Sequence, residues 1–112
     1  MTDCIFCKMV SGEIKPDIVY ENEQVLAFRD INPQAPVHIL IIPKAHISTL
    51  NDLKDTSLAG RLLQAVIKVA AQEGLDDDGY RTVINCNEQG GQEVFHLHLH
   101  VLGRRQMRWP PG

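Results

Sequence analysis

The sequence lacks the features that would assign it to a membrane, a secretory route or a nucleic acid. No apolar run approaches the roughly 18 residues that a membrane span needs, and no signal peptide is visible at the N-terminus. Basic residues are outnumbered by acidic ones, which gives a formal net charge of −3. A pI near 5.9 argues against non-specific binding to nucleic acid or to an anionic membrane. We therefore expect a cytoplasmic protein with neither of these partners.

Cysteine is also scarce. Three cysteines, Cys4, Cys7 and Cys86, make an odd number in a chain without a secretory signal, so we expect thiols rather than disulfides. No internal repeat, low-complexity tract or linker divides the 112 residues. This length suits one domain that buries about two-thirds of its unfolded surface, and we expect a single domain over residues 1–112.

The spacing of apolar residues predicts an α+β fold. A short helix is expected over Ile5–Val10, ended by Gly12, and a main amphipathic helix between Thr56 and Glu73, ended by Gly74. Period-two and continuous apolar runs predict five strands, at residues 18–20, 25–29, 37–43, 81–87 and 95–103. The short connections favour antiparallel pairing, hence an antiparallel five-stranded sheet with the main helix on one face.

Three of the five histidines alternate with leucine in "HLHLHVL", residues 96–102. In a strand, His96, His98 and His100 share one face, while Phe95, Leu97, Leu99 and Val101 share the other and face the core. A rise of about 3.3 Å per residue separates His96 from His100 by roughly 13 Å, too far for one ion to bind all three easily. Metal binding by two of them, nucleophilic catalysis by a neutral imidazole, and solvent-facing histidines without a role are the three interpretations.

The loop "NCNEQGGQE" precedes the histidines and contains Asn85, Gly90, Gly91 and Gln92. Paired glycines let backbone amides approach a phosphate closely, and an amide side chain can bind a phosphoryl oxygen. A hairpin turn that needs positive φ is the alternative. Beside three histidines, a phosphate-handling site is favoured.

Four segments resemble one family. "HLHLHVL" matches the pattern His-x-His-x-His followed by hydrophobic residues, and "FRDINPQAPVHILIIPKAHI", "GGQEVFHLHLHVLG" and "RQMRWPPG" are similar to the Hint branch of the histidine triad (HIT) family. The resemblance covers nearly the whole chain. It implies a HIT-like homodimer in which both protomers contribute strands to one continuous sheet.

The resemblance also implies an activity. Members of the Hint branch are purine nucleoside phosphoramidases, so the implied substrates are adenosine or guanosine 5′-phosphoramidates and related acyl nucleotides, hydrolysed through a nucleotidyl-histidine. No cofactor is implied for catalysis. Two other functions stay open, a dinucleoside polyphosphate hydrolase and a nucleotide-binding regulatory module whose catalysis is incidental. The "WPPG" ending and the Gly-Gly-Gln loop favour the phosphoramidase of the Hint branch.

The resemblance assigns roles to individual residues. His98 is the nucleophile, His100 binds a phosphate oxygen, His38 and His96 belong to the same cluster, and Asp30 holds the ribose hydroxyls. The phosphate-side loop comprises Asn85, Gly91, Gln92 and Val94, with Glu93 where many eukaryotic relatives have serine. The apolar purine pocket comprises Ile5, Phe6, Ile14, Phe28 and Ile31. The tail with Trp109 approaches the partner's site, and Arg104 replaces the second glycine of a common "LGG".

The pair Cys4 and Cys7 is a Cys-x-x-Cys motif, which alone is weak support for zinc. A thioredoxin-like role is disfavoured because the pair does not open a helix after a strand. Some bacterial members of the family carry a structural zinc, and there the remaining ligands correspond to His46 and His96. The resemblance thus implies a Cys₂His₂ site; the alternative is two buried thiols and a surface His46.

Overall fold

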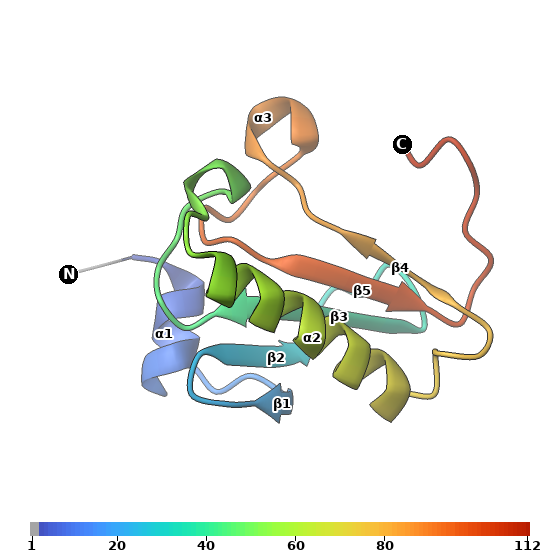
Figure 1. Cartoon of the computed structure of the whole chain (residues 1–112), viewed down its shortest axis with the longest axis horizontal. Helices are drawn as coiled ribbons and strands as arrows, with labels where there is room; N and C mark the ends of the chain where they lie inside the picture. Colours follow the sequence, from blue (N-terminus) through green and yellow to red (C-terminus); the bar gives the residue numbers. More distant parts are fainter. Residues whose placement is uncertain (1–2) are drawn as a thin grey trace.

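The computed structural model describes residues 3–112 of the chain. The elements follow one another in the order shown in Figure 1: α1 (Ile5–Ser11), β1 (Ile18–Glu21), β2 (Val25–Arg29), β3 (Val37–Pro43), the 3₁₀ turn η1 (Leu50–Asp52), α2 (Thr56–Gln72), β4 (Tyr80–Val83), α3 (Asn87–Gly90) and β5 (Leu99–Gly103). No helix within residues 3–112 is long and apolar enough to cross a membrane.

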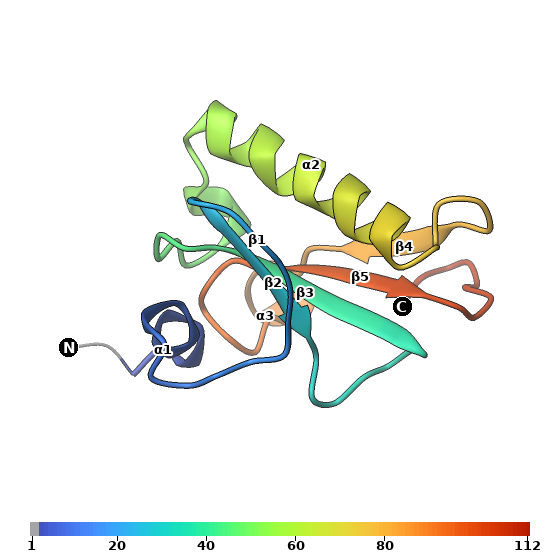
Figure 2. The ribbon, with the colours of Figure 1, turned by 90° about the horizontal axis from the view of Figure 1, so that it is seen from below.

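The five strands form one antiparallel sheet in the order β1-β2-β3-β5-β4. Figure 2 shows α2 along one face of this sheet and α1 beyond the other face. The predicted α+β architecture, with its five-stranded antiparallel sheet and one main helix, is therefore confirmed. β4 lies at the end of the strand order and so has one unpaired edge.

β3 is buried along its whole length, which explains its continuous apolar sequence. Its odd positions Ile39 and Ile41 pack in a core with the buried stripe of α2, and its even positions Leu40 and Ile42 pack in a second core with Phe6 of α1. Two-sided burial of this kind contributes roughly 1.5–3 kcal/mol for each fully buried aliphatic side chain. The second core forms the floor of the face that carries the histidines.

Both predicted helix ends are confirmed. Gly12, with φ of 86°, ends α1, and Gly74, with φ of 72°, follows the last residues of α2. At the other end of α2, the Asp55 carboxylate accepts hydrogen bonds from the amides of Ser57 and Leu58, an N-cap that the apolar spacing did not reveal.

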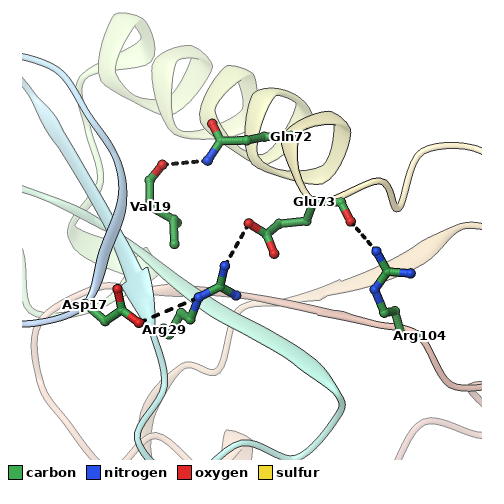
Figure 3. Close-up of polar contacts among 6 residues, drawn as sticks. All are labelled: Asp17, Val19, Arg29, Gln72, Glu73 and Arg104. Atoms are coloured by element: carbon green, nitrogen blue, oxygen red, sulfur yellow. Dashed lines mark hydrogen bonds and ion pairs between the residues drawn. The ribbon is translucent and has the colours of Figure 1, made fainter.

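Polar contacts tie the C-terminal end of α2 to the sheet (Figure 3). The Gln72 amide donates to the Val19 carbonyl at 2.7 Å, and Arg29 donates to the Glu73 carboxylate at 3.0 Å. Arg104 donates to the Glu73 carbonyl at 2.7 Å, although its own φ of 67° lies in the region that favours glycine. Its guanidinium thus satisfies a helix-end carbonyl. Its positive charge also lies at the negative end of the helix dipole, which is favourable.

The strand predicted over residues 95–103 is shorter in the structure, since β5 starts at Leu99. The reason lies in β3, which ends at Pro43, so the Leu97 amide donates instead to the carbonyl of Ile47 at 2.6 Å. The alternation survives, because Leu97, Leu99 and Val101 are all buried. Phe95 was wrongly expected in the core: it is 48% exposed.

The strand predicted over residues 81–87 is also shorter. β4 ends at Val83, and Asn87 begins the short helix α3 with a positive φ of 61°. The Gln92 side chain explains this change, because its Oε1 accepts the Asn87 amide hydrogen at 2.9 Å and thereby turns the chain. The loop therefore contains the short helix α3 and is held by a side-chain hydrogen bond, so it is not a plain hairpin turn.

Candidate active site

A hollow of about 950 Å³ lies between α1, the turn after β2 and the histidines of the 96–100 segment. It collects side chains from both ends of the chain. Those that the sequence singled out are Ile5, Phe6, Ile14, Phe28, Asp30, Ile31, His38, Glu93, Val94, His98 and His100. Elements far apart in sequence therefore meet at one open site.

His98 is held in one tautomer by its own chain. Its Nδ1 lies 2.7 Å from the carbonyl oxygen of His96. A carbonyl only accepts hydrogen bonds, so Nδ1 must donate, and the neutral ring keeps an unprotonated Nε2. The ring is 8% exposed and lies edge-on to Phe6, with centroids 5.2 Å apart. Such a ring is oriented for nucleophilic attack.

Hydrogen bonds hold His38 and His100 in the other tautomer, in which the ring proton lies on Nε2. The Gln34 amide donates to Nδ1 of His38 at 3.0 Å, so the neutral His38 ring carries its proton on Nε2. That Nε2 lies 2.9 Å from Nδ1 of His100, which must accept, and His100 therefore carries its proton on Nε2. This last atom is buried and has no hydrogen-bond partner within residues 3–112. The unpartnered donor belongs to a ring that lines the hollow.

Both of these histidines are neutral near pH 7. Burial lowers the pKa of His38, and the nearby Asp30 carboxylate opposes this by raising it. Burial also lowers the pKa of His100 to about 4, with the charges of His98 and His38 adding to the effect and Asp30 opposing it. Neutral rings are what the hydrogen-bond chain requires.

Asp30 lies at the rim of the hollow, directly after β2. Its Oδ1 accepts the Asn32 amide hydrogen at 2.8 Å, and its Oδ2 lies 3.5 Å from Nε2 of His38. The first contact fixes the carboxylate in a turn, and the second leaves Oδ2 beside the histidine chain. A carboxylate oxygen in this place can accept from a ligand hydroxyl.

The apolar wall of the hollow comes from α1 and from β2. Phe6 and Phe28 meet edge to face with centroids 5.5 Å apart, and both are buried. Ile31 is 96% exposed although it lines the hollow. An exposed apolar side chain at a rim offers surface to a flat apolar ligand such as a nucleobase.

Other expected site residues do not line the hollow: Asn85, Gly91, Gln92, His96 and Trp109. Gln92 is buried, and its amide bonds three backbone groups, those of Asn87, Ser48 and Val94. It braces the loop, whose residues Glu93 and Val94 do reach the hollow. Trp109 is 82% exposed on the C-terminal tail.

The expected metal ligands converge near the N-terminal end of α1. Sγ of Cys4 lies 3.3 Å and Sγ of Cys7 lies 3.6 Å from Nδ1 of His96, while Sγ of Cys7 lies 3.2 Å from Nδ1 of His46. All four ligand atoms fall within 4.8 Å of one another. Nε2 of His96 donates to the Pro43 carbonyl at 2.8 Å, so its Nδ1 is unprotonated, as a metal ligand must be. The donor set therefore fits tetrahedral zinc.

Eight residues that line the hollow were not expected from the sequence: Met9, Lys15, Pro16, Asp17, Arg29, Asn32, Gln34 and Leu40. Lys15 gave no signal beyond its charge. Gln34 acts through its backbone amide, which any residue except proline provides, and its only mark in the sequence is its place between Pro33 and Pro36, four residues before His38.

Histidines fixed in complementary tautomers above an apolar hollow define a hydrolase of the histidine triad class. Residues 11–107 match the HIT domain family, and the chain belongs to it. The Escherichia coli purine nucleoside phosphoramidase is 50% identical over 107 residues, covering 94% of this chain and 90% of that protein.

Two further relatives agree with this membership. A 14 kDa zinc-binding protein of Brassica juncea is 52% identical over 114 residues, covering 98% of this chain and all of that protein. The crystal structure of a HIT family hydrolase from Legionella pneumophila superposes with a TM-score of 0.95 at 55% identity, covering 98% of this chain and all of that one. The fold, the family and the hydrolase class are thus established for this chain.

Proposed function

We propose that the protein hydrolyses purine nucleoside 5′-phosphoramidates and related acyl nucleotides, with His98 as the nucleophile. One observation carries the proposal: His98 offers an unprotonated Nε2, and its neighbour His100 offers a protonated Nε2, on rings whose centroids lie 5.0 Å apart. A phosphoryl group needs both, an attacking lone pair for phosphorus and a donor for an oxygen. The similar E. coli protein is named for this activity.

The reaction proceeds in two displacements. Nε2 of His98 attacks the α-phosphorus, the P–N bond breaks, and the amine leaves with a proton taken from solvent. Water then attacks the nucleotidyl-histidine, the bond from phosphorus to His98 breaks, and the nucleoside monophosphate is released with loss of a proton. The Nε2 hydrogen of His100 stabilises the phosphoryl oxygen in both steps. No step requires a cofactor.

The remaining contacts suit a nucleoside monophosphate, AMP or GMP. Phe6, Phe28, Ile5, Ile14 and Ile31 supply the apolar wall for the purine, and Asp30 accepts from the ribose hydroxyls. Val94 and Glu93 border the phosphate, while the Gln92 side chain and the backbone amide of Gly91 hold that loop through hydrogen bonds. Glu93 puts a carboxylate where the leaving group departs, which favours cationic leaving groups over anionic ones.

A panel of leaving groups tests the proposal. Steady-state kcat/KM is measured on adenosine 5′-phosphoramidate, on an amine-linked AMP with a cationic side chain, and on diadenosine polyphosphate. We expect the two P–N substrates to exceed the polyphosphate by at least about a hundredfold, which corresponds to about 2.7 kcal/mol of barrier. Preference for the polyphosphate, or tight AMP binding without turnover of any of them, would replace the proposal by one of the two alternatives.

We also propose that Cys4, Cys7, His46 and His96 hold a structural zinc. The convergence of their ligand atoms supports it, as does the name of the Brassica relative. Zinc bound there stabilises the fold because it joins α1 to the segments that carry His46 and His96. It supplies no atom to the reaction at His98.

A homodimer is the third part of the proposal. β4 has an unpaired edge, and α2 exposes Leu63 and Ile67, each by 55%. Leu63 borders an apolar hollow with Ile84, just after β4, so edge and apolar surface are neighbours. Light scattering tests this assembly. We expect a dimer mass for the wild type and a monomer mass for Leu63→Asp; a monomeric wild type at micromolar concentration would remove the assembly.

A further inference from the structure

Arg105, two residues after the end of β5, is hydrogen-bonded to the turn before β3. Its Nε donates to the Gln34 carbonyl at 3.0 Å, across 71 positions of sequence. The same residue, Gln34, donates its backbone amide to Nδ1 of His38 at 3.0 Å. Gln34 is therefore held at its carbonyl by Arg105 and supports the histidine chain at its amide.

The other hydrogen bonds of this turn are internal to it. The Asn32 amide bonds the Asp30 carboxylate, and the Gln34 side chain bonds the Asn32 carbonyl. Within residues 3–112, the Arg105 hydrogen bond is the one that connects residues 31–36 to a segment outside the turn and its flanking strands. The place of the Gln34 amide thus depends on a side chain that does not line the active-site hollow.

We propose that Arg105 is a positioning residue for the reaction: by holding Gln34, it fixes the tautomers of His38 and His100. This inference rests on the proposed function. If the Gln34 amide withdraws, Nδ1 of His38 is free to carry the ring proton, and Nε2 of His38 loses the hydrogen that it donates to His100. The neutral His100 ring then takes its own proton on Nδ1, and its Nε2 no longer donates to the phosphoryl oxygen.

The neighbouring residue provides a matched control. Arg104 also donates to one backbone carbonyl, that of Glu73 at 2.7 Å, but this carbonyl belongs to the end of α2 (Figure 3). Arg104→Gly removes a guanidinium and a carbonyl contact of the same kind, and glycine accepts the φ of 67° at this position. It changes the net charge by the same amount as Arg105→Ala and leaves the turn alone.

Two measurements on the full-length variants test the proposal. The first is kcat on adenosine 5′-phosphoramidate; the second is the ring ¹⁵N spectrum at pH 7.5, which reports the tautomer of each histidine. For Arg105→Ala we expect kcat to fall about tenfold with KM little changed, together with a mixture of tautomers at His38 and His100. Arg105→Lys restores most of kcat and the wild-type ring signals, and Arg104→Gly keeps both.

Unchanged ring signals in Arg105→Ala overturn the proposal, whether or not kcat falls, because a merely structural loss does not alter the tautomers. An equal change of ring signals in Arg104→Gly overturns it as well. Failure of the proposed function looks different: the wild type then turns over no phosphoramidate, while the ring ¹⁵N spectra still decide whether Arg105 controls the tautomers.

Discussion

Nε2 of His38 lies 2.9 Å from Nδ1 of His100, although 62 positions separate the two residues. The contact follows from strand register. β3 and β5 are antiparallel neighbours in which His38 is opposite Leu102 and Leu40 is opposite His100, so the two histidines are diagonal neighbours on one face. A slip of one residue would send every side chain of one strand to the other face. The pairing of the strands therefore brings the two rings within hydrogen-bond distance.

His98→Ala should abolish turnover and leave AMP binding largely intact. Loss of the nucleophile removes the covalent route, which costs on the order of 4 kcal/mol or more in barrier, about a thousandfold or more in rate. The proposed base and ribose contacts lie on α1, β2 and the turn after it. Steady-state assays and calorimetric AMP titration measure the two effects, and rapid quench of the wild type should trap adenylate on His98. Retention of a tenth of the activity, or adenylate on His96 or His100, would reassign the nucleophile.

Stability should decrease as the pH falls from about 6.5 towards 4. The pKa of His100 is about 4 in the fold, against an ordinary value near 6.5, so in this window the unfolded chain binds a proton that the folded chain does not. Each such proton changes the free energy of unfolding by at most about 1.4 kcal/mol per pH unit. Urea titrations of the wild type and of His100→Asn measure it. We expect a shallower pH dependence for the variant; identical slopes would show that His100 is not the group responsible.

Purified protein should contain about one zinc per chain when zinc is supplied and chelators are avoided. Cys4→Ser should lower the melting temperature more than it lowers the rate per folded molecule, because the proposed zinc joins segments and does not touch the reacting atoms. Cys86→Ser is the matched control, since Cys86 stands outside the cluster. Metal analysis and thermal unfolding decide the outcome. Substoichiometric zinc in the wild type would contradict the site.

Gly103→Ala should destabilise the fold by about 1–3 kcal/mol through overpacking. A Cβ at this position would lie 2.6 and 2.8 Å from the two methyl groups of Leu75, which is buried. Gly60→Ala lies in the exposed part of α2, where the new Cβ would meet no atom of residues 3–112 within 4 Å apart from the local helix backbone, so it should instead stabilise by about 0.5–1 kcal/mol. Urea unfolding compares the pair. Equal effects of the two substitutions would show that the Leu75 contact relaxes without cost.

Helices and strands were predictable where local spacing decides them. The stripe of α2 and the glycines at positions 12 and 74 marked two helices correctly, because apolar period and positive φ are properties of short segments. The expected bounds of β2 and β3 are confirmed, whereas the end of β4 and the start of β5 were not predictable. β5 begins late because Leu97 bonds Ile47, and β4 ends early because Gln92 turns Asn87, and both bonds depend on residues outside the strand itself.

The candidate site was also predictable only in part. Alternation indicated three histidines on one side, but which nitrogen carries each proton depends on the carbonyl of His96 and on the amide of Gln34. Those are backbone groups, and no side-chain pattern records them. The apolar residues and Asp30 that the resemblance assigns to the nucleotide site line one hollow, and their roles stay predictions, whereas Gln92 faces the loop that it braces.

His96 divides its contacts between two places. Its ring faces the thiols of Cys4 and Cys7, while its carbonyl oxygen accepts the Nδ1 hydrogen of His98. The second contact links the His98 ring to the backbone oxygen two positions earlier, and the two groups can meet because one residue separates the histidines. The single residue between these histidines is therefore a spacer of fixed length. An insertion there would keep every histidine in the chain and still deprive the His98 ring of the oxygen that orients it.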